Sequence, residues 1–233
     1  MKYYQTTLSI ASLIIGILLA SAANANSNNP SGQKIYLRAD LGYNFFLTPS
    51  ATTASFFNNS RINATNTHVA NNIGYNLGLG YQLLPRVRSD ITFTYRPSIS
   101  YNLTDNAPEV GKATLNNYTV MLNGYYDFKV NPEFTPYVGA GIGASRNSTN
   151  FIYWPVAAQK ESGRSITQLA WQVGAGFACP LTKRLLFDVS YQFIDLGSFK
   201  NTGVFNVGPP GAPTSWKTLY SNQVQAGVRY SLA

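Results

Sequence analysis

The sequence predicts an all-β fold, an eight-stranded antiparallel up-and-down barrel that spans a membrane. Three observations indicate this fold. Apolar and polar residues alternate with a period of two in eight segments, as they do in strands. The links between these segments are short and long in strict alternation. Charged residues make up only 11% of the chain while aromatic residues reach 14%, and a barrel wall in lipid accounts for such a composition.

The N-terminus has the pattern of an export signal. Lys2 gives a positive start, an apolar run covers residues 8–19, and residues 23–25 (Ala-Asn-Ala) have the small-x-small spacing of a cleavage site. A transmembrane helix is the alternative, but the run is shorter than the ~20 residues that a bilayer span needs. We therefore predict a cleaved signal peptide at residues 1–25, a flexible lead-in at residues 26–33 and a barrel domain at residues 34–233.

One hairpin, within residues 164–197, indicates which solvent surrounds the barrel. Its two strands are joined by a short link at residues 180–184, and each has one aromatic and aliphatic face and one face of small and polar residues, with Asp188 in the middle of a polar face. In a lipid-embedded barrel the polar face lines the lumen and the apolar face contacts the acyl chains. A soluble eight-stranded barrel of the lipocalin type is the alternative. It would have to place the charged rows outside and the aromatic rows inside.

The remaining strands follow the same alternation. The first five are expected at residues 34–46, 71–82, 87–101, 113–128 and 134–146, the hairpin supplies the sixth and seventh, and the last covers residues 218–232. The links at residues 47–70 and 198–217 are long enough to form an extra hairpin each. Ten strands therefore stay open as an alternative to eight.

The third strand contains Pro97, which removes a hydrogen-bond donor from the ladder. We therefore expect a weakened ladder or a bulge at this point. The residues predicted to share the apolar face of this strand are Ile91, Phe93, Tyr95 and Ile99.

Three segments resemble a known family. They are FTPYVGAGIGAS at residues 134–145, AWQVGAGFACPLTKRLLFDVSYQF at residues 170–193 and QVQAGVRYSL at residues 223–232. They are similar to the opacity-type, porin-like outer-membrane β-barrel surface proteins of Gram-negative bacteria. The resemblance covers the strands across most of the chain and implies an outer-membrane location, with short periplasmic turns and long outer loops. One departure is the terminus, because such barrels commonly end on an aromatic residue and this chain ends Tyr-Ser-Leu-Ala.

Eight strands enclose a lumen just wide enough for side chains to fill it. The predicted inward rows hold four arginines and four aspartates: Arg38, Arg88, Arg96 and Arg229 with Asp40, Asp90, Asp127 and Asp188. Buried charges are tolerated when they are paired and hydrogen-bonded. We therefore interpret this set as a salt-bridge plug. The alternative is a narrow charge-lined conduit, which glycine rows on the inner wall at residues 74–80 and 139–143 would favour.

The expected outer loops are basic. Seven cations outnumber three anions: Arg61, Lys112, Arg146, Lys160, Arg164, Lys200 and Lys217 against Asp105, Glu109 and Glu161. Such a surface would complement lipopolysaccharide phosphates or an acidic host glycan. Aromatic residues exposed in loops are available for contact with a ligand. The candidates are Tyr153, Trp154, Phe205 and Trp216.

We expect no catalytic residues, no cofactor and no metal. Enzymes built on such barrels usually need a His base, and the only histidine, His68, lies in a Thr- and Asn-rich loop without a nearby carboxylate. One His and one lipid-facing Cys, Cys179, cannot build a zinc site. The Gly-rich stretch at residues 139–143 is typical of a strand rather than of a phosphate loop.

The sequence thus predicts an exported, monomeric outer-membrane barrel whose outer loops act in adhesion, ligand binding or envelope integrity. A narrow porin for small solutes is the alternative. The expected partners are outer-membrane lipid, lipopolysaccharide and a host or surface ligand. The net charge of +8 could also suggest nucleic acid as a partner, but the export signal argues against it.

Overall fold

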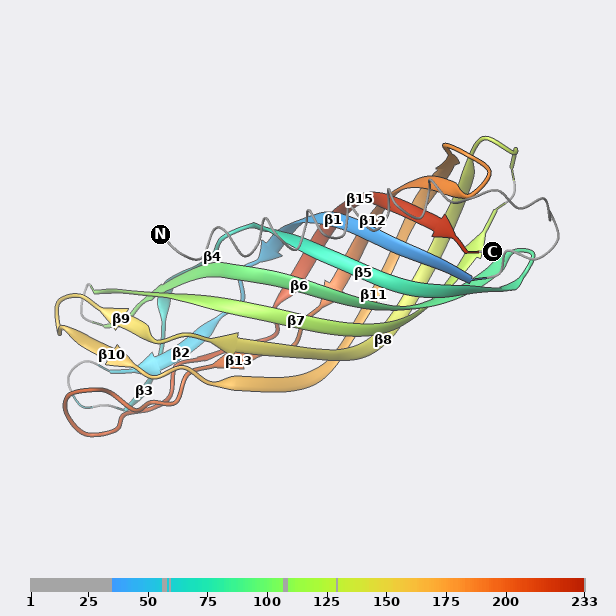
Figure 1. Cartoon of the computed structure of the whole chain (residues 1–233). Helices are drawn as coiled ribbons and strands as arrows, with labels where there is room; N and C mark the ends of the chain where they lie inside the picture. Colours follow the sequence, from blue (N-terminus) through green and yellow to red (C-terminus); the bar gives the residue numbers. More distant parts are fainter. Residues whose placement is uncertain (1–34, 56–57, 59, 107–108, 129, 233) are drawn as a thin grey trace, which may run out of the picture.

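The computed structural model describes residues 35–55, 58, 60–106, 109–128 and 130–232. Eight long strands close into one antiparallel barrel (Figure 1): β1 (Ile35–Leu47), β5 (Asn72–Leu84), β6 (Val87–Thr104), β7 (Val110–Asp127), β8 (Thr135–Thr149), β11 (Ser165–Pro180), β12 (Leu185–Asp195) and β15 (Tyr220–Ser231). Each pairs with its neighbours in chain order, and β15 pairs with β1. The predicted eight-stranded fold is confirmed. The predicted signal peptide and lead-in lie outside the described residues.

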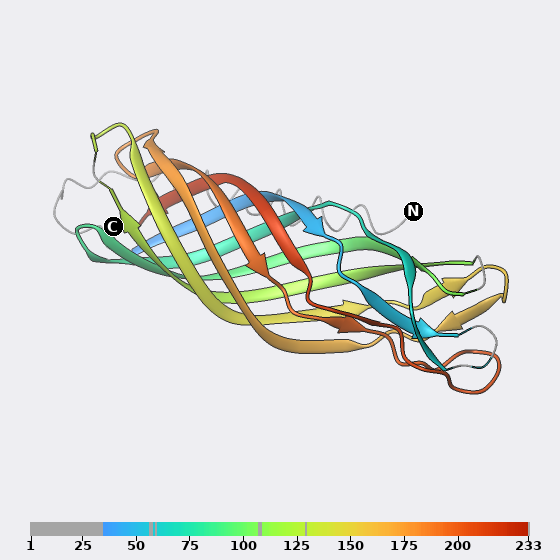
Figure 2. The same ribbon diagram turned by 180° about the vertical axis from the view of Figure 1, so that it is seen from behind.

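The strands are strongly staggered around the barrel. We start at Tyr36 of β1 and move from each residue to the one directly opposite on the next strand. After one circuit of the barrel this path reaches β1 again at Phe46, so the strands are staggered by ten residues in total. The partners on the way are Gly80, Asp90, Asn123, Gly141, Gln172, Ile194 and Ser221. Closing a barrel with such a stagger requires the strands to tilt, as Figure 2 shows.

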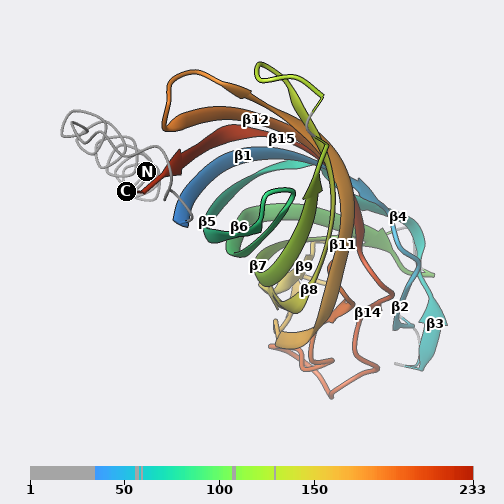
Figure 3. The same cartoon turned by 90° about the vertical axis from the view of Figure 1, so that its right-hand side faces the viewer.

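The two ends of the barrel differ. The short links at residues 85–86, 128–134 and 181–184 lie at one end, together with the start of β1 and the end of β15 (Figures 1 and 3). The long links gather at the other end. In outer-membrane barrels short turns face the periplasm and long loops face outward, so we call these the periplasmic end and the outer end. No helix in the described part of the chain is long and apolar enough to span a membrane.

The long links fold into additional short strands. These are β2 (Ala51–Ala54), β3 (Arg61–Asn63), β4 (Thr65–Val69), β9 (Ile152–Trp154), β10 (Gln159–Glu161), β13 (Phe199–Lys200) and β14 (Ser215–Trp216). Strands β13, β14, β2 and β3 form a separate four-stranded sheet, while β4 pairs with β6 and β9 pairs with β7 above the barrel. None of them adds a strand to the closed ring, so the ten-strand alternative is wrong. We call the described residues of links 48–71, 105–109, 150–164 and 196–219 the cap.

The alternation of apolar and polar residues matches the two faces of the barrel wall. On β1 the side chains of Arg38 and Asp40 are buried, while those of Leu41 and Phe45 are exposed on the outside. Aromatic side chains gather at both edges of the apolar wall. Tyr95 and Tyr118 stack with centroids 4.9 Å apart near the outer edge, and Phe134 and Phe177 pack at 5.1 Å near the periplasmic edge. Such aromatic girdles mark the two membrane interfaces.

Pro97 produces the expected bulge in β6. The β6–β7 register shifts between Arg96 and Ile99, and Ser98 has a φ of 49°. The extra residue reverses the face on which each later side chain lies. Ile99 is therefore fully buried, and its predicted place on the lipid face is wrong. Tyr101 and Leu103 follow it into the interior, while Ser100 is exposed on the outside.

Candidate functional site

The periplasmic half of the lumen contains a cluster of ion pairs around Arg38. Its Nε lies 2.9 Å from Asp40 Oδ2, its Nη1 lies 3.3 Å from Asp90 Oδ2, and its Nη2 lies 3.9 Å from Asp188 Oδ1. All four side chains are at most 1% exposed. They come from β1, β6 and β12, so the cluster ties together three strands that are distant around the barrel.

Two further arginines extend this cluster. Arg229 Nε lies 2.9 Å from Asp188 Oδ2, and Arg88 Nε lies 3.0 Å from Asp127 Oδ1. The Arg88 guanidinium carbon also lies 3.8 Å from the ring centroid of Tyr125. A cation over an aromatic face in a desolvated site is stabilised by the ring quadrupole. Seven of the eight predicted lumen charges thus lie in one network.

Three tyrosines complete the network, and the sequence analysis did not select them. Tyr36 Oη donates to Asp90 Oδ2 at 3.1 Å, Tyr137 Oη donates to Asp188 Oδ1 at 2.5 Å, and Tyr125 Oη accepts from Arg38 Nη1 at 3.0 Å. Each lies on the inward face of its strand and is nearly fully buried. The period-two pattern places them on that face, so the pattern could have identified them.

Arg96 is the exception among the predicted lumen charges, because it lies inside the barrel and has no carboxylate partner among the described residues. Its guanidinium donates to Asn44 Oδ1 at 2.9 Å, Asn117 Oδ1 at 3.0 Å, Thr119 Oγ1 at 3.2 Å and Gln223 Oε1 at 2.9 Å. The expected balance of four pairs is therefore not what the structure shows. Arg96 instead forms a second layer, made of amides and a hydroxyl, on the outer side of the ion-pair cluster.

The glycine rows of the inner wall make room for these side chains. A Cβ at Gly80 would collide with the Tyr36 ring, one at Gly139 with the Tyr125 ring, and one at Gly141 with the Asn123 amide. The space that remains beside Tyr125 and the inner glycines is about 10 Å³, which is about one water molecule. These glycines accommodate the large polar side chains of the lumen.

The outer mouth of the barrel is covered by an apolar core under the cap. The ring of Trp216 stacks on Phe199 at 5.2 Å and meets the edge of Tyr101 at 5.4 Å. The core joins side chains from the barrel strands to side chains from the cap: Phe46, Ala51, Val69, Ile99, Tyr101, Leu103, Leu115, Ile152, Trp154, Ile194, Leu196, Phe199, Trp216 and Leu219.

Two of the four aromatic residues predicted to be exposed for ligand contact are buried. Trp154 is 5% exposed and Trp216 is 2% exposed, so the expectation of exposed indole rings is wrong for both. The loops pack on one another, and these rings supply much of the apolar area that holds them together. Phe205 is partly buried against the same core, while Tyr153 is 40% exposed.

The acidic residues of the cap point inward. Glu161 is fully buried, and its carboxylate accepts hydrogen bonds from the backbone of Gly203 and Thr214 at 2.9 and 3.0 Å. Burial raises the pKa of the Glu161 carboxyl, and these hydrogen bonds partly oppose the rise. Glu109 Oε1 accepts from the backbone of Val156 and Ala157, and Asp105 is also buried.

The basic residues at the outer end point outward. Six of the seven predicted loop cations are exposed, and Lys200 is half-buried: the six are Arg61, Lys112, Arg146, Lys160, Arg164 and Lys217. Asp105, Glu109 and Glu161 are buried, and Asp195 at the outer end of β12 is only half-exposed. The exposed cations therefore make the outer surface positively charged. His68 is exposed on β4, and the described residues contain no group of three or more His, Cys, Asp or Glu that could hold a metal.

Comparison with known proteins agrees with this architecture. Residues 11–231 match the outer membrane protein beta-barrel domain family. The outer membrane protein PagN of Salmonella typhimurium is 36% identical over 81 residues, which is 34% of each chain. A putative adhesin of Rickettsia conorii is 23% identical and aligns with 84% of this chain over 81% of its own.

A solved structure supports the fold alone. Neisserial surface protein A has a TM-score of 0.52 and 18% identity, and the alignment covers 85% of this chain and 97% of that one. The family and the outer-membrane location that the sequence implied are confirmed. The chain belongs to the outer membrane protein beta-barrel domain family and is a surface protein of the bacterial outer membrane.

Proposed function

We propose that this protein is a closed barrel that acts at the cell surface by binding acidic ligands through its outer end. The observation that carries this proposal is the separation of charge at that end. Glu161, Glu109 and Asp105 are buried while the cations around them are exposed. A surface on which exposed cations far outnumber exposed anions attracts sulfated or phosphorylated partners over a distance. Adhesion and envelope integrity are the roles that such binding would serve.

The interior supports a closed lumen rather than a pore. An ion-pair cluster, the Arg96 layer and the apolar core follow one another from the periplasmic end outward. We therefore expect no steady conductance when the folded protein is inserted in a planar bilayer. Regular single-channel steps would contradict the closed lumen and favour the narrow porin.

The relatives named putative adhesins support a role in binding. We propose outer-membrane lipid and lipopolysaccharide as the resident partners, and an acidic host or surface glycan as the external one. We also propose that the protein is a monomer without catalytic activity. His68, the residue that a hydrolase would need as a base, lies on the outside of β4, opposite Asn102 of β6.

The test is binding to dextran sulfate by the detergent-solubilised, folded protein. The variant Arg61→Gln with Lys217→Gln removes two exposed cations from the cap. We expect it to bind about fivefold more weakly, or about 1 kcal/mol, and to show a smaller salt dependence. The matched control is Arg86→Gln with Lys183→Gln, which removes two exposed cations from the periplasmic end. Equal losses in the two pairs would mean that only net charge matters, and would contradict the proposal.

A further inference from the structure

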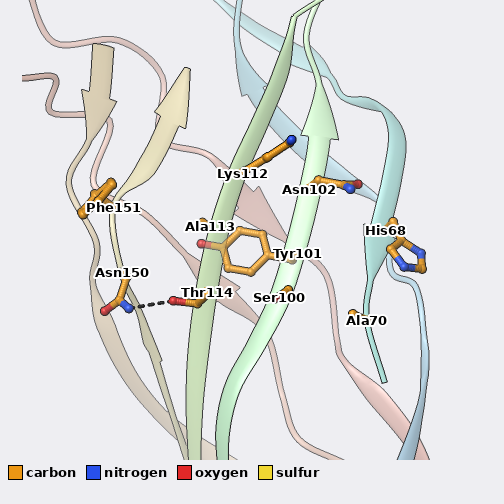
Figure 4. A pocket seen from close by; sticks show the side chains of 10 residues that line it. All are labelled: His68, Ala70, Ser100, Tyr101, Asn102, Lys112, Ala113, Thr114, Asn150 and Phe151. Atoms are coloured by element: carbon orange, nitrogen blue, oxygen red, sulfur yellow. Dashed lines mark hydrogen bonds between the residues drawn. The ribbon is translucent and has the colours of Figure 1, made fainter. Parts of the chain in front are cut away.

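A groove of about 500 Å³ runs along the outer side of β6 and β7 above the barrel (Figure 4). His68 of β4 borders it on one side and Phe151, just before β9, on the other, with Ser100, Asn102, Lys112 and Thr114 between them. Its volume lies in the range of sites that bind small molecules. Two of its lining residues, Tyr101 and Ala113, also belong to the apolar core under the cap or pack against it.

The bulge at Pro97 gives the groove its polar floor. If the same sequence paired without the bulge, the alternation of β6 would continue and Ile99 and Tyr101 would face outward. With the bulge, Ser100 and Asn102 line the groove and Ile99 is buried, while Tyr101, which also lines the groove, is only 2% exposed. The floor continues onto β7 with Thr114, whose hydroxyl accepts a hydrogen bond from Asn150 Nδ2 at 2.7 Å. Hydroxyl and amide groups of this kind are the usual hydrogen-bond partners for sugar hydroxyls.

Lys112 and Phe151 line the groove, and Lys160 and Tyr153 lie beside them. Lys112 of β7 lies opposite Tyr153 of β9, and Tyr153 lies opposite Lys160 of β10. The Cα atoms of the two lysines are thus about 10 Å apart, because neighbouring strands lie close to 5 Å apart. Lys160 Nζ lies 5.0 Å from the ring centroid of Phe151. All four side chains are exposed, and within the described residues Lys112 forms no ion pair. Cations beside exposed rings suit an anionic sugar.

The groove continues the lipid-facing wall. On β7, Tyr118 of the outer aromatic girdle lies four residues after Thr114 and six residues after Lys112, and all three share the outward face. At ~3.3 Å per residue these positions lie ~13 to ~20 Å further along the strand, and the tilt of the strands reduces the height to roughly 10–15 Å. The headgroup layer of a simple phospholipid is only ~5–8 Å deep. A ligand anchored in the outer leaflet must therefore carry several sugars to reach Lys112.

We propose that this groove binds the phosphorylated oligosaccharide of an outer-leaflet glycolipid, with its acyl chains against the apolar wall of β6 and β7. Thr114, Asn102 and Ser100 would bond the sugar hydroxyls. Lys112 and Lys160 would hold phosphate, and Phe151 and Tyr153 would contact the sugar faces. Arg61 and Lys217, whose replacement tests the proposed surface for acidic ligands, lie outside the lining of the groove, so the two ideas can fail separately.

The experiment measures glycolipid retained by the folded full-length protein in nanodiscs of zwitterionic lipid, by native mass spectrometry. The probe is a rough lipopolysaccharide with a phosphorylated core. Comparison probes are the same glycolipid with its core phosphates removed, phosphatidylglycerol, and the free core oligosaccharide without acyl chains. We expect at least tenfold stronger retention of the intact glycolipid than of the other three.

The groove variant is Lys112→Gln with Lys160→Gln, and the matched control is Arg86→Gln with Lys183→Gln, two exposed cations of the periplasmic end. We expect about tenfold weaker retention for the groove variant and a change within twofold for the control. Phe151→Ala should weaken retention about threefold without changing charge. Heat-modifiable migration on a gel checks that each variant is folded. Equal losses in both charge variants, equal retention of phosphatidylglycerol, or equally tight binding of the free oligosaccharide would each overturn the proposal.

Discussion

The lumen and the cap use the same charged residue types in opposite ways. In the lumen, Arg38 and Asp188 lie in one network and compensate each other within a few ångströms. In the cap, Glu161 is buried among backbone hydrogen-bond donors, while Lys160, the residue immediately before it, is exposed. The first arrangement holds distant strands together, and the second leaves the exterior positively charged. The position of a charge relative to its partner, more than its number, therefore decides its role.

The largest effect should come from removing one charge from the lumen. Asp188→Asn leaves Arg38 and Arg229 without their shared carboxylate. Breaking a buried pair in this way costs about 3–5 kcal/mol, which we expect as a decrease in the free energy of unfolding in urea, measured in lipid vesicles. The control Glu133→Gln removes an exposed acid at the periplasmic end and should change stability by less than about 0.5 kcal/mol. Similar values for both variants would show that water screens the lumen charges.

A smaller effect, confined to the cap, should follow Trp216→Ala. The indole is buried against Phe199 and Tyr101, and truncating such a core ring costs about 3 kcal/mol. We expect faster proteolysis of the cap, while the barrel stays heat-modifiable. The neighbouring exposed Lys217→Ala should leave the proteolysis rate unchanged. Unfolding of the whole barrel by Trp216→Ala would mean that cap and lumen form one cooperative unit.

The smallest effect should be a change in pH dependence. The pKa of Glu161 is raised above its ordinary value of 4.5 by burial. The folded cap therefore binds this proton more tightly than the unfolded cap does, and the resulting stability is fully present below pH 4.5 and is lost as pH rises through the folded pKa. Glu161→Gln should remove this decrease. Limited proteolysis of the cap across this range tests it, and an unchanged pH profile in the variant would contradict the assignment to Glu161.

The strands, their count and the lumen charges could be predicted because alternation is a local property of the chain. The burial of Arg38, Asp90 and Asp188 follows from the period of two alone. Which arginine pairs with which aspartate could not be predicted, because this depends on the stagger of the strands, which only the closed barrel determines. Arg96 illustrates this point: it has the same inward position in the pattern, yet its neighbours across the lumen are amides.

The cap was predicted less well. Trp154 and Trp216 were expected outside because they stand in long links, and long links usually lie on the surface. Their burial results from contacts among three links that are far apart in the sequence and with the ends of the barrel strands. The inward direction of Glu161 has the same origin, since its partners Gly203 and Thr214 belong to another link. Composition showed that the outer loops are basic, and only tertiary contacts reveal where the acids lie.

The bulge at Pro97 decides on which face of β6 each later side chain lies. Deletion of the single residue Ser98 would remove the extra position, and the residues on both sides would keep their faces, with Arg96 still opposite Asn117 and Ile99 still opposite Leu115. Regular pairing of the undeleted strand would instead turn Ile99, Tyr101 and Leu103 outward together and Ser100 and Asn102 inward. Because of this one unpaired residue, the odd-numbered apolar side chains of a single strand face lipid before the bulge and the covered core after it.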